Sequence, residues 1–397
     1  MQPIEIRPNI YWVGVNDRST DLFEGLWPIS YQGVTYNAYL IKDEKNALID
    51  LSKETFTDDF INQLESLIGL ENLDYVITNH MEPDHSGALL RLRELAPQAK
   101  FLGMNKAVAM MKDFYGIDQN VEVLKHEQTL SLGRNTLKFI YTPFVHWPET
   151  MMTYMVEEKI LFSCDGFGSF GCLDGVLFDD ETSDQGFYEH EALRYYTNII
   201  AAFSKHVLQA LEKLSAYEIN IVAPSHGLVW RKDPGRIISL YKYWASLATE
   251  RAESGVTVLY GTMYRNTERA LEHALQALAS ENVPVEVFNV GLTDPSYILP
   301  ELWTKQGVLI AAPTYERAMF PAMVHALNMA EIKGVRNKTA AYIGSYSWSG
   351  GAKSVFEGYA ERLNWDIVGT HEFIGSAKAD DLEQIRALSR QLALKSK

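Results

Sequence analysis

Two patterns of hydrophobic and polar positions divide this chain into a front half and a back half. In the front half, apolar and polar residues alternate over short segments, and a period of two predicts β-strands. The expected elements are hairpins over 36–51 and 153–166, strands over 75–79 and 220–227, and helices over 85–94 and 187–214. Hairpins combined with helices predict an α+β sandwich with the sheets inside and the helices outside.

The back half has a different period. Continuous apolar strands are expected over 256–261, 285–290, 307–315 and 339–346, with helical patterns between them. After the first strand, one helical stripe contains Ala270, Leu271, Ala274, Leu275 and Leu278. Alternating strands and helices predict a doubly wound parallel sheet. The boundary is expected where the sequence RAESG precedes the first of these strands, which divides the chain into domains over 1–252 and 253–397.

Composition narrows the classes of protein that remain. A chain of 397 residues is too long for one typical core, so two domains are expected. The net charge of −15 argues against nucleic-acid binding, which needs clustered Lys and Arg. No apolar run of about 18 residues predicts a membrane span, and the N-terminus does not resemble a signal peptide. Because only Cys164 and Cys172 are present, a reducing, cytoplasmic compartment is expected.

The densest group of potential metal ligands is the segment HMEPDH directly after the strand over 75–79. It contains His80, Glu82, Asp84 and His85. Two imidazoles and two carboxylates at one strand end are costly in apolar surroundings unless a cation neutralises them. The segment therefore predicts a metal site.

Three further candidate ligands each follow a strand-like segment: His146, Asp165 and His226. Loops at the edge of a sheet can bring such residues together from distant parts of the chain. A lone histidine is nevertheless more often a surface or helix-capping residue than a ligand, and that alternative stays open for His146 and His226. The remaining histidines, at ordinary helical or polar positions, are interpreted as structural or exposed.

Three loops of the back half predict a binding site for a phosphorylated, flat cofactor. The loop 261–267 joins the first strand to the first helix, where free backbone N–H groups and the helix dipole favour a phosphate. Many such turns only cap a helix. The loops 312–320 and 344–352 add the aromatic side chains Tyr315, Tyr346 and Trp348. Together the loops indicate a flavodoxin-type site at the carboxyl ends of the strands.

The metal motif resembles that of the metallo-β-lactamase fold, H-x-H-x-D-H, with Glu82 in place of the second histidine. A carboxylate there makes the site harder and more anionic, which favours iron over zinc. The resulting pattern, H-x-E-x-D-H, resembles that of the flavodiiron protein family. The resemblance covers essentially the whole chain. It implies a metallo-β-lactamase-like αββα sandwich with a diiron site, followed by a flavodoxin-like domain that binds FMN.

The same resemblance implies how the two iron ions are held. One would be bound by His80, Glu82 and His146, and the other by Asp84, His85 and His226, with Asp165 between them. His85 is the least secure ligand, because that histidine does not coordinate in every member of the family. No catalytic residue is expected beyond these ligands.

Sixteen residues of the three back-half loops are the expected FMN contacts: Thr262, Met263, Tyr264, Arg265, Asn266, Thr267, Pro313, Thr314, Tyr315, Glu316, Ser345, Tyr346, Ser347, Trp348, Ser349 and Gly350. Three places depart from the family pattern. Arg265 and Ser347 stand where glycine is common, and Glu316 with Arg317 replaces an amide-rich pair.

The implied activity is reduction of dioxygen to water, of nitric oxide to nitrous oxide, or of both. Electrons would pass through FMN from an external donor such as rubredoxin, because the chain has no C-x-x-C pair for a rubredoxin iron. The family also implies a head-to-tail homodimer or a pair of such dimers. Two rival hypotheses are a zinc hydrolase of the metallo-β-lactamase fold and an electron carrier without a working metal site. Glu82 and the full set of ligands argue against them.

Overall fold

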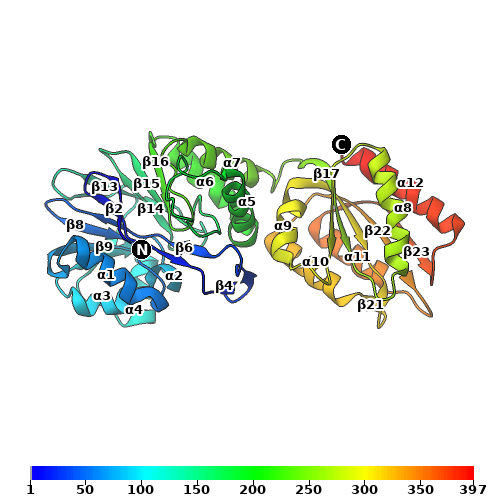
Figure 1. Cartoon of the computed structure of the whole chain (residues 1–397), viewed down its shortest axis with the longest axis horizontal. Helices are drawn as coiled ribbons and strands as arrows, with labels where there is room; N and C mark the ends of the chain where they lie inside the picture. The colour runs from blue at the N-terminus through cyan, green and yellow to red at the C-terminus, as the bar shows by residue number, and fades with distance from the viewer. Residues whose placement is uncertain (1) are drawn as a thin grey trace. The chain divides into compact units, whose positions relative to one another are not determined.

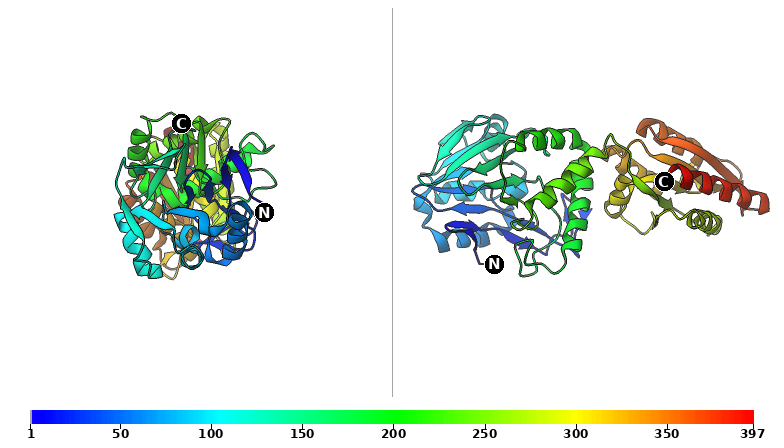
Figure 2. Two further views of the ribbon diagram at one scale, coloured as in Figure 1. Left: turned by 90° about the vertical axis from the view of Figure 1, so that its left-hand side faces the viewer. Right: turned by 90° about the horizontal axis from the view of Figure 1, so that it is seen from above.

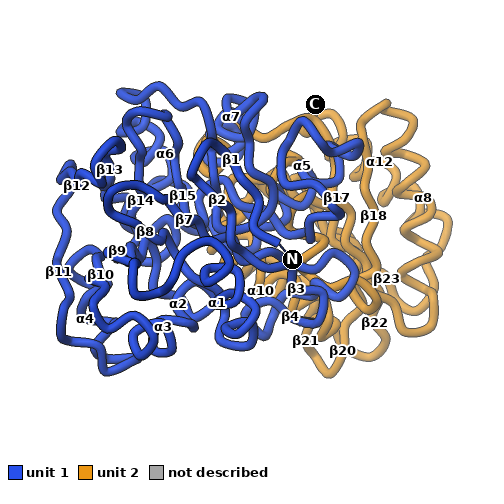
Figure 3. Tube along the Cα trace, turned by 60° about the vertical axis from the view of Figure 1, so that its left-hand side comes forward, with its two compact units in different colours: residues 1–245 blue, residues 246–397 orange. Residues whose placement is uncertain are grey.

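The computed structural model describes residues 2–397, which divide into two compact units, Met1–Ala245 and Ser246–Lys397 (Figure 3). The first strand of the second unit begins at Glu253, inside the segment RAESG. The assignment of a diiron domain to 1–252 and of an FMN domain to 253–397 stays a prediction.

Unit 1 contains two large sheets with helices outside them (Figure 1). One sheet has seven strands in the order β1-β2-β7-β8-β9-β10-β11, and the other has five in the order β12-β13-β14-β15-β16. The strands are β1 (Ile4–Arg7), β2 (Ile10–Trp12), β3 (Val15–Asp17), β4 (Leu22–Phe23), β5 (Trp27–Pro28), β6 (Val34–Tyr36), β7 (Tyr39–Ile41), β8 (Asn46–Ile49), β9 (Leu73–Ile77), β10 (Lys100–Met104), β11 (Val121–Leu124), β12 (Thr129–Ser131), β13 (Thr136–Tyr141), β14 (Met151–Met155), β15 (Ile160–Cys164) and β16 (Ile221–Pro224).

The helices of unit 1 lie on opposite sides of these strands, α1 to α4 on one side and α5 to α7 on the other (Figure 1). They are α1 (Thr57–Leu67), α2 (Pro83–Ser86), α3 (Leu89–Leu95), α4 (Asn105–Tyr115), α5 (Gln185–Tyr195), α6 (Ser204–Leu214) and α7 (Pro234–Ser246), with short turns η1 (Glu54–Phe56), η2 (Leu70–Asn72), η3 (Tyr196–Ile200) and η4 (Ala201–Phe203). Apolar faces of α1, α3 and α4 pack on the seven-stranded sheet, where Phe60, Leu92 and Met111 are completely buried. This arrangement confirms the predicted sandwich.

Both predicted hairpins of unit 1 are confirmed, since β7 pairs with β8 and β14 pairs with β15, each antiparallel. The two predicted helices are each interrupted. The helix expected over 85–94 is divided into α2 and α3, because backbone groups there bond to the segment after β8: Leu51 N–H donates to the His85 carbonyl and Ala88 N–H to the Ser52 carbonyl.

The helix expected over 187–214 is also not continuous. It consists of α5, the π-helical turn η3, the 3-10 turn η4 and α6. Both Thr197 Oγ1 and Asn198 Nδ2 donate to the Arg194 carbonyl, at 3.1 and 2.6 Å. Such side-chain bonds compete with the helical backbone ladder and bend a helix locally. The period of the sequence alone does not reveal this competition.

Unit 2 is a five-stranded parallel sheet in the order β18-β17-β19-β22-β23, with helices on both faces (Figures 1 and 2). This is the flavodoxin-like strand order, and it confirms the predicted doubly wound sheet. The elements are β17 (Glu253–Tyr260), α8 (Asn266–Ser280), β18 (Val285–Asn289), α9 (Pro295–Thr304), β19 (Lys305–Ala311), β20 (Thr314–Tyr315), β21 (Ala318–Met319), α10 (Pro321–Lys333), β22 (Thr339–Tyr346), α11 (Ala352–Leu363), β23 (Asp366–Ile374) and α12 (Ala379–Lys395).

A buried lysine holds one helix end of unit 2. Lys338, just before β22, is 3% exposed, and its Nζ donates to the Trp303 carbonyl in the last turn of α9 at 2.7 Å. A cation at a helix C-terminus is favourable, but burial disfavours the charged form. Burial lowers the pKa of Lys338 to about 7.

We expect Lys338 to make the stability of the chain rise with pH between about 7 and 10.5. In that range the unfolded chain keeps a proton on Lys338 that the folded chain has released, so deprotonation favours folding. Relative to Lys338→Met, the wild type should gain about 3–4 kcal/mol in unfolding free energy between pH 7 and 10, measured by urea denaturation. Lys395→Met, at an exposed ion pair with Asp366, is the control. A constant difference across pH would contradict the expectation.

Candidate metal centre and flavin pocket

The carboxyl ends of several strands bring all seven predicted metal ligands together in unit 1. His80 and Glu82 lie in the loop after β9, Asp84 and His85 open α2, His146 precedes β14, Asp165 follows β15, and His226 follows β16. They form two groups, and within each group one potential ligand atom per residue lies within 4.8 Å of the others. The groups are His80, Glu82, His146 and Asp165, and Asp84, His85 and His226.

Asn79 anchors the loop that carries HMEPDH to the end of β8 in one sheet and to β14 in the other. The backbone and side-chain amides of Asn79 donate to Asp50 at 2.7 and 3.1 Å, and Thr153 Oγ1 donates to Asn79 Oδ1 at 2.7 Å. All three residues are buried. A proline at the first position of α2 then starts the turn that presents Asp84 and His85. These hydrogen bonds therefore fix the loop without a metal ion.

Asp165 faces both groups, one with each carboxylate oxygen. Its Oδ2 lies 3.3 Å from His80 Nε2 and 3.4 Å from His146 Nε2. Its Oδ1 lies 3.0 Å from His85 Nε2 and 3.3 Å from His226 Nε2. A carboxylate in this position can bridge two cations.

The remaining two carboxylates each face one group. Glu82 Oε2 lies 3.3 Å from His80 Nε2 and 3.0 Å from His146 Nε2. Asp84 Oδ2 lies 3.3 Å from His85 Nε2 and 3.4 Å from His226 Nε2. Each carboxylate therefore converges with two imidazoles on one point.

Buried polar atoms without partners show that this cluster fits metal ions. Among residues 2–397, neither oxygen of Asp84 or Asp165 and neither nitrogen of His85 has a hydrogen bond, and His226 Nε2 also has none. Buried groups of this kind are costly unless a cation binds them. Nitrogen and oxygen ligands with three carboxylates are typical of iron among transition metals. The residues present fit two metal ions.

The pKa values of the clustered side chains reflect the short distances between carboxylates and imidazoles. Burial alone would lower the pKa of His226, but the nearby Asp165 and Asp84 carboxylates, 3.3 and 3.4 Å from its Nε2, raise it to about 10. For Asp165, burial alone would raise the pKa, but His85 and His80 hold it well below its usual range. Metal ions must displace the imidazole protons, so metal uptake should release protons.

Two of the imidazoles are oriented by partners on their outer nitrogens. Glu149 accepts a hydrogen bond from His80 Nδ1 at 2.6 Å, and the Thr35 carbonyl accepts one from His226 Nδ1 at 2.6 Å. Such contacts set the tautomer and direction of a metal-binding histidine. His85 Nδ1 has no partner within residues 2–397, which agrees with its weaker expected role.

Sequence reasoning missed the groups that surround the ligands. Glu149 lies three residues after His146, and a carboxylate so close to a candidate ligand is a signal that could have identified it. Tyr195 gives no such signal. It is completely buried, its ring centroid lies 5.4 Å from that of His226, and its hydroxyl has no hydrogen-bond partner among residues 2–397.

A hollow of about 390 Å³ lies over the edge of the cluster. Its lining residues are Thr20, Leu22, Phe23, Glu24, Gly25, Tyr36, Lys53, Glu82, Pro83 and Asp84. Because Glu82 and Asp84 belong to different ligand groups, the hollow reaches both of them. It provides space for a small molecule to approach the carboxylates.

In unit 2, the three predicted loops enclose one cavity of about 720 Å³. It is lined by Met263, Tyr264, Asn266, Pro313, Thr314, Tyr315, Glu316, Arg317, Ser345, Tyr346, Ser347, Trp348, Ser349 and Gly375. Twelve of the sixteen predicted FMN contacts are in this lining, which also includes Arg317 and Gly375. Thr262, Arg265, Thr267 and Gly350 are not in the lining.

Local bonds explain the positions of three of those four residues. Thr262 Oγ1 accepts a hydrogen bond from the Arg265 amide at 2.9 Å, and Thr267 shares a hydroxyl bond of 3.0 Å with Ser345. Arg265 itself is the N-cap of α8 with a φ of 68°, and its guanidinium pairs with Glu268. Thr262 and Thr267 therefore stabilise the turn that presents the helix N-terminus to the cavity.

The cavity suits a flat molecule with a phosphate. Trp348 and Tyr264 are 89% and 85% exposed and offer free ring faces, while the N-terminus of α8 offers backbone N–H groups. The loops also approach each other too closely for side chains: a Cβ at Gly351 would lie 2.1 Å from the Arg317 carbonyl oxygen. These features fit FMN.

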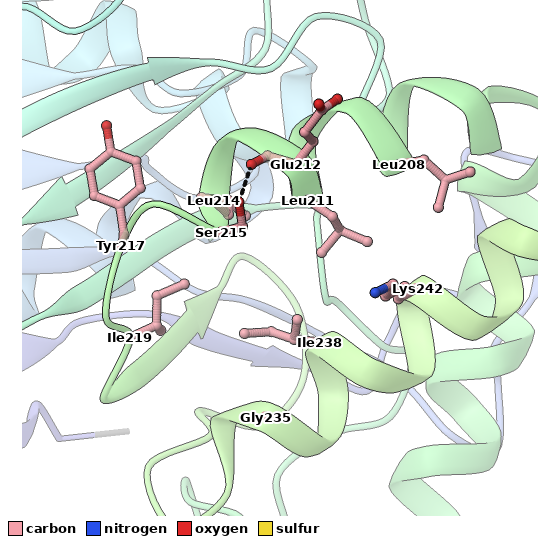
Figure 4. A pocket seen from close by; sticks show the side chains of 10 residues that line it. All are labelled: Leu208, Leu211, Glu212, Leu214, Ser215, Tyr217, Ile219, Gly235, Ile238 and Lys242. Atoms are coloured by element: carbon pink, nitrogen blue, oxygen red, sulfur yellow. Dashed lines mark hydrogen bonds between the residues drawn. The ribbon is translucent and has the colours of Figure 1, made fainter.

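A third hollow, of about 490 Å³, lies between α6 and α7 (Figure 4). Leu208, Leu211 and Ile238 line it, with Glu212 and Lys242 beside them. None of the seven candidate ligands lies there.

Within residues 2–397, no helix is both long and apolar enough to cross a lipid bilayer.

Replacing Glu149 by Gln should weaken iron binding at the group that contains His80. The change keeps the size of the side chain but removes the charge that orients the imidazole, so the affinity should fall about tenfold or more. Competition with a chelator, followed by iron analysis, measures the affinity. Glu158→Gln, at a partly exposed carboxylate that pairs with Arg7, is the control. Equal iron affinities in the two variants would contradict the role of Glu149.

Replacing Gly351 by Ala should weaken FMN binding, because the new Cβ would collide with the Arg317 carbonyl and separate two loops of the cavity. We expect at least a tenfold rise in the dissociation constant, measured by flavin fluorescence quenching. Gly334→Ala is a matched control: Gly334 also has a positive φ, of 75°, but a Cβ there meets nothing within 4 Å in the described chain. If both variants bound FMN as the wild type does, the loops would not depend on this contact.

Known proteins are similar to this chain in sequence over both units. Residues 34–227 match the model of the family described as ODP family beta lactamase. The chain is 34% identical over 401 residues to a protein named nitric oxide reductase from Moorella thermoacetica, covering 99% of this chain and 98% of that protein. It is 36% identical over 355 residues to the anaerobic nitric oxide reductase flavorubredoxin of Salmonella arizonae, of which it covers 73%.

Solved structures are similar over both units. Rubredoxin oxygen:oxidoreductase from Desulfovibrio gigas has a TM-score of 0.95 at 26% identity, covering 99% of this chain and 98% of that one. The flavodiiron protein from Giardia intestinalis has a TM-score of 0.95 at 29% identity, covering 100% and 97%. Because the match extends over nearly the full length of the Moorella thermoacetica protein and of these two structures, the chain belongs to the flavodiiron protein family.

Proposed function

We propose that this chain is an oxidoreductase that reduces nitric oxide, dioxygen or both at two iron ions, with electrons supplied through FMN. The observation that carries the proposal is the position of Asp165, whose two oxygens face separate groups of ligands. The names of the relatives support the two gases as substrates: nitric oxide reductase in one case and an oxygen oxidoreductase in another.

The seven ligands would hold the metals as the sequence predicts. His80, Glu82 and His146 face one position, Asp84, His85 and His226 face the other, and Asp165 lies between them. When bound, FMN and two ferrous ions would together supply four electrons, which equals the requirement for reducing dioxygen to water and exceeds the two needed for two nitric oxide molecules.

The protein's own residues would provide access and a dry surrounding. The hollow beside Glu82 and Asp84 is wide enough for a diatomic gas. Aromatic rings surround the second group, since Phe23, Tyr36 and Tyr195 all lie against His226. The Tyr195 hydroxyl has no hydrogen-bond partner among residues 2–397, and burial together with the nearby Asp165 charge raises its pKa. It would therefore be free to donate a hydrogen bond beside the ligand cluster.

Sixteen loop residues remain the proposed FMN contacts, with Arg317 and Gly375 added because they line the same cavity. The name of one similar structure supports rubredoxin, or a similar small protein, as the electron donor. A head-to-tail homodimer, or a pair of such dimers, remains a prediction. The exposed Trp348 and Tyr264 at the rim of the cavity provide an apolar surface for contact with a second copy. The cytoplasmic location also stays a prediction.

Purified chain reconstituted under anaerobic conditions should contain about two irons and one FMN. Once reduced, it should consume nitric oxide, dioxygen or both in stopped-flow experiments. Removing the iron with a chelator should abolish gas consumption and leave FMN reduction by the donor intact, because the cavity in unit 2 shares no residue with the ligand groups. Gas reduction at an unchanged rate in iron-free protein, or zinc-dependent ester hydrolysis by the reconstituted chain, would overturn the proposal.

A further inference from the structure

The loop 142–150 joins β13 to β14 and carries the candidate ligand His146 near its middle. Two hydrogen bonds close the base of this loop: the Thr142 amide donates to the Thr150 carbonyl at 3.1 Å, and Thr150 Oγ1 donates to the Thr142 carbonyl at 2.7 Å. The position of the tip depends on other contacts, because a loop that is held only at its base stays mobile at its tip.

The loop contacts the first ligand group, which consists of His80, Glu82, His146 and Asp165. The ring of Trp147 lies with its centroid 5.1 Å from that of His80 and 6.1 Å from that of His146. Glu149 accepts the hydrogen bond from His80 Nδ1. No residue of the loop belongs to the second group, which consists of Asp84, His85 and His226. A shift of the loop tip would therefore disturb one metal position more than the other.

Phe144 connects the tip of the loop to the helical segment beside it. Its ring centroid lies 6.1 Å from that of Phe203, with an angle of 20° between the planes, and 4.9 Å from that of His206. Phe203 ends η4, and His206 lies in the first turn of α6. The Phe144 amide also donates to the Trp147 carbonyl at 2.7 Å, so Phe144 closes the short segment that contains His146.

Two unfavourable features accompany this contact. Phe144 has a φ of 64°, a left-handed conformation that is rare for a bulky side chain. His206 Nδ1 is buried and has no hydrogen-bond partner within residues 2–397, which is also unfavourable. Such features persist where the surrounding structure imposes them, and they are frequent at functional sites. The candidate ligand nearest to Phe144 in the chain is His146, two residues later.

The helical segment that carries these rings contacts both ligand groups. Tyr195, at the end of α5, lies against His226 of the second group. Beyond the turn η3, Phe203 and His206 lie against Phe144, in the loop of the first group. The interrupted helical segment therefore supports the metal site at two places.

We propose that Phe144 is a positioning residue for His146: packing of its ring on the neighbouring helical segment fixes the loop tip, so that the imidazole stays beside the first metal position. The inference rests on the proposed function, because it concerns an iron ion held by the first ligand group. Outer contacts of a metal ligand strengthen binding by keeping the ligand in the required direction. Phe144 acts through His146 and is not itself a ligand.

Phe144→Leu keeps an apolar side chain and the same backbone requirement, but removes the aromatic ring. In the full chain, iron affinity should fall about tenfold or more at one position and change by less than about threefold at the other. Competition with a chelator, followed by iron analysis, measures both affinities. When iron is supplied at a concentration that fills both positions of the wild type, Mössbauer spectroscopy of the variant should show one iron signal reduced and the other retained.

This selectivity distinguishes positioning from a general effect on stability. A merely structural role would lower the unfolding free energy of the chain and weaken both iron positions alike, and that result would overturn the inference. Phe144→Tyr keeps the ring and should bind both irons as the wild type does. Iron binding by Phe144→Tyr that is as weak as that of Phe144→Leu would show that the ring contact is not responsible.

Phe187→Leu is a matched control in the same unit. Like Phe144, Phe187 is partly exposed and has an aromatic neighbour, since its ring centroid lies 5.1 Å from that of Tyr188. Phe187 lies in the first turn of α5 and belongs to neither ligand group. This variant should therefore keep the wild-type affinity at both iron positions.

Phe203→Leu tests the same contact from its other side and also serves if Phe144→Leu does not fold. It should weaken the same iron position as Phe144→Leu. In the double variant the loss should be smaller than the product of the two single losses, because both changes remove one shared contact. Unchanged iron affinity in Phe203→Leu, or single losses that multiply in the double variant, would overturn the inference.

The outcomes separate the two proposals. If the wild-type chain bound no iron, the proposed function would fail and this inference with it. If the wild type bound two irons but Phe144→Leu and Phe187→Leu bound them equally well, the diiron function would stand and the role of Phe144 would be rejected.

Discussion

The structure of unit 1 depends on one electrostatic constraint: seven ionisable side chains converge in its interior. Three carboxylates and four imidazoles lie within hydrogen-bonding or ion-pairing distance of each other. Burying these groups without counter-ions costs several kcal/mol per unpaired charge, and the partnerless oxygens of Asp84 and Asp165 show that the protein does not satisfy them by itself. Two cations would do so. Each oxygen of Asp165 faces a different group of ligands, which explains why the site suits two metal ions instead of one.

The fold meets this constraint by fixing the ligands from outside the cluster. Sheet edges supply the loops, and buried partners such as Glu149 and the Thr35 carbonyl set the direction of two imidazoles. Two interruptions of helical structure also lie close to candidate ligands in the chain or in space. The short helix α2, which contains His85, ends at Ser86 before α3 begins at Leu89, and the π-helical turn after Tyr195 follows directly on a side chain that packs against His226. Irregular backbone is therefore concentrated where side chains must reach one point.

In unit 2, the comparable constraint is close approach of loops at the carboxyl ends of parallel strands. Glu316 and Arg317 both have positive φ values, of 48° and 63°, in the turn between β20 and β21, a conformation that usually favours glycine or asparagine. The turn brings the Arg317 carbonyl against Gly351. Backbone strain of this kind is common at ligand sites, where surrounding contacts maintain it.

The sequence by itself determined the fold class, some of the strands in each large sheet and the seven candidate ligands that the structure brings together, because these features are encoded locally. Alternation, apolar runs and the spacing of HMEPDH depend only on neighbouring residues. Glu82, in place of the second histidine of H-x-H-x-D-H, also distinguished this chain from the metallo-β-lactamase motif. Only the tertiary structure decided which groups meet the candidate ligands and where two predicted helices are interrupted: the partners of the imidazoles, the place of Tyr195, and the divisions of the helices. The Thr35 carbonyl and Tyr195 are far from His226 in the chain, so no local pattern could specify these contacts. The hydrophobic period also does not show that Thr197 and Asn198 bond to the Arg194 carbonyl.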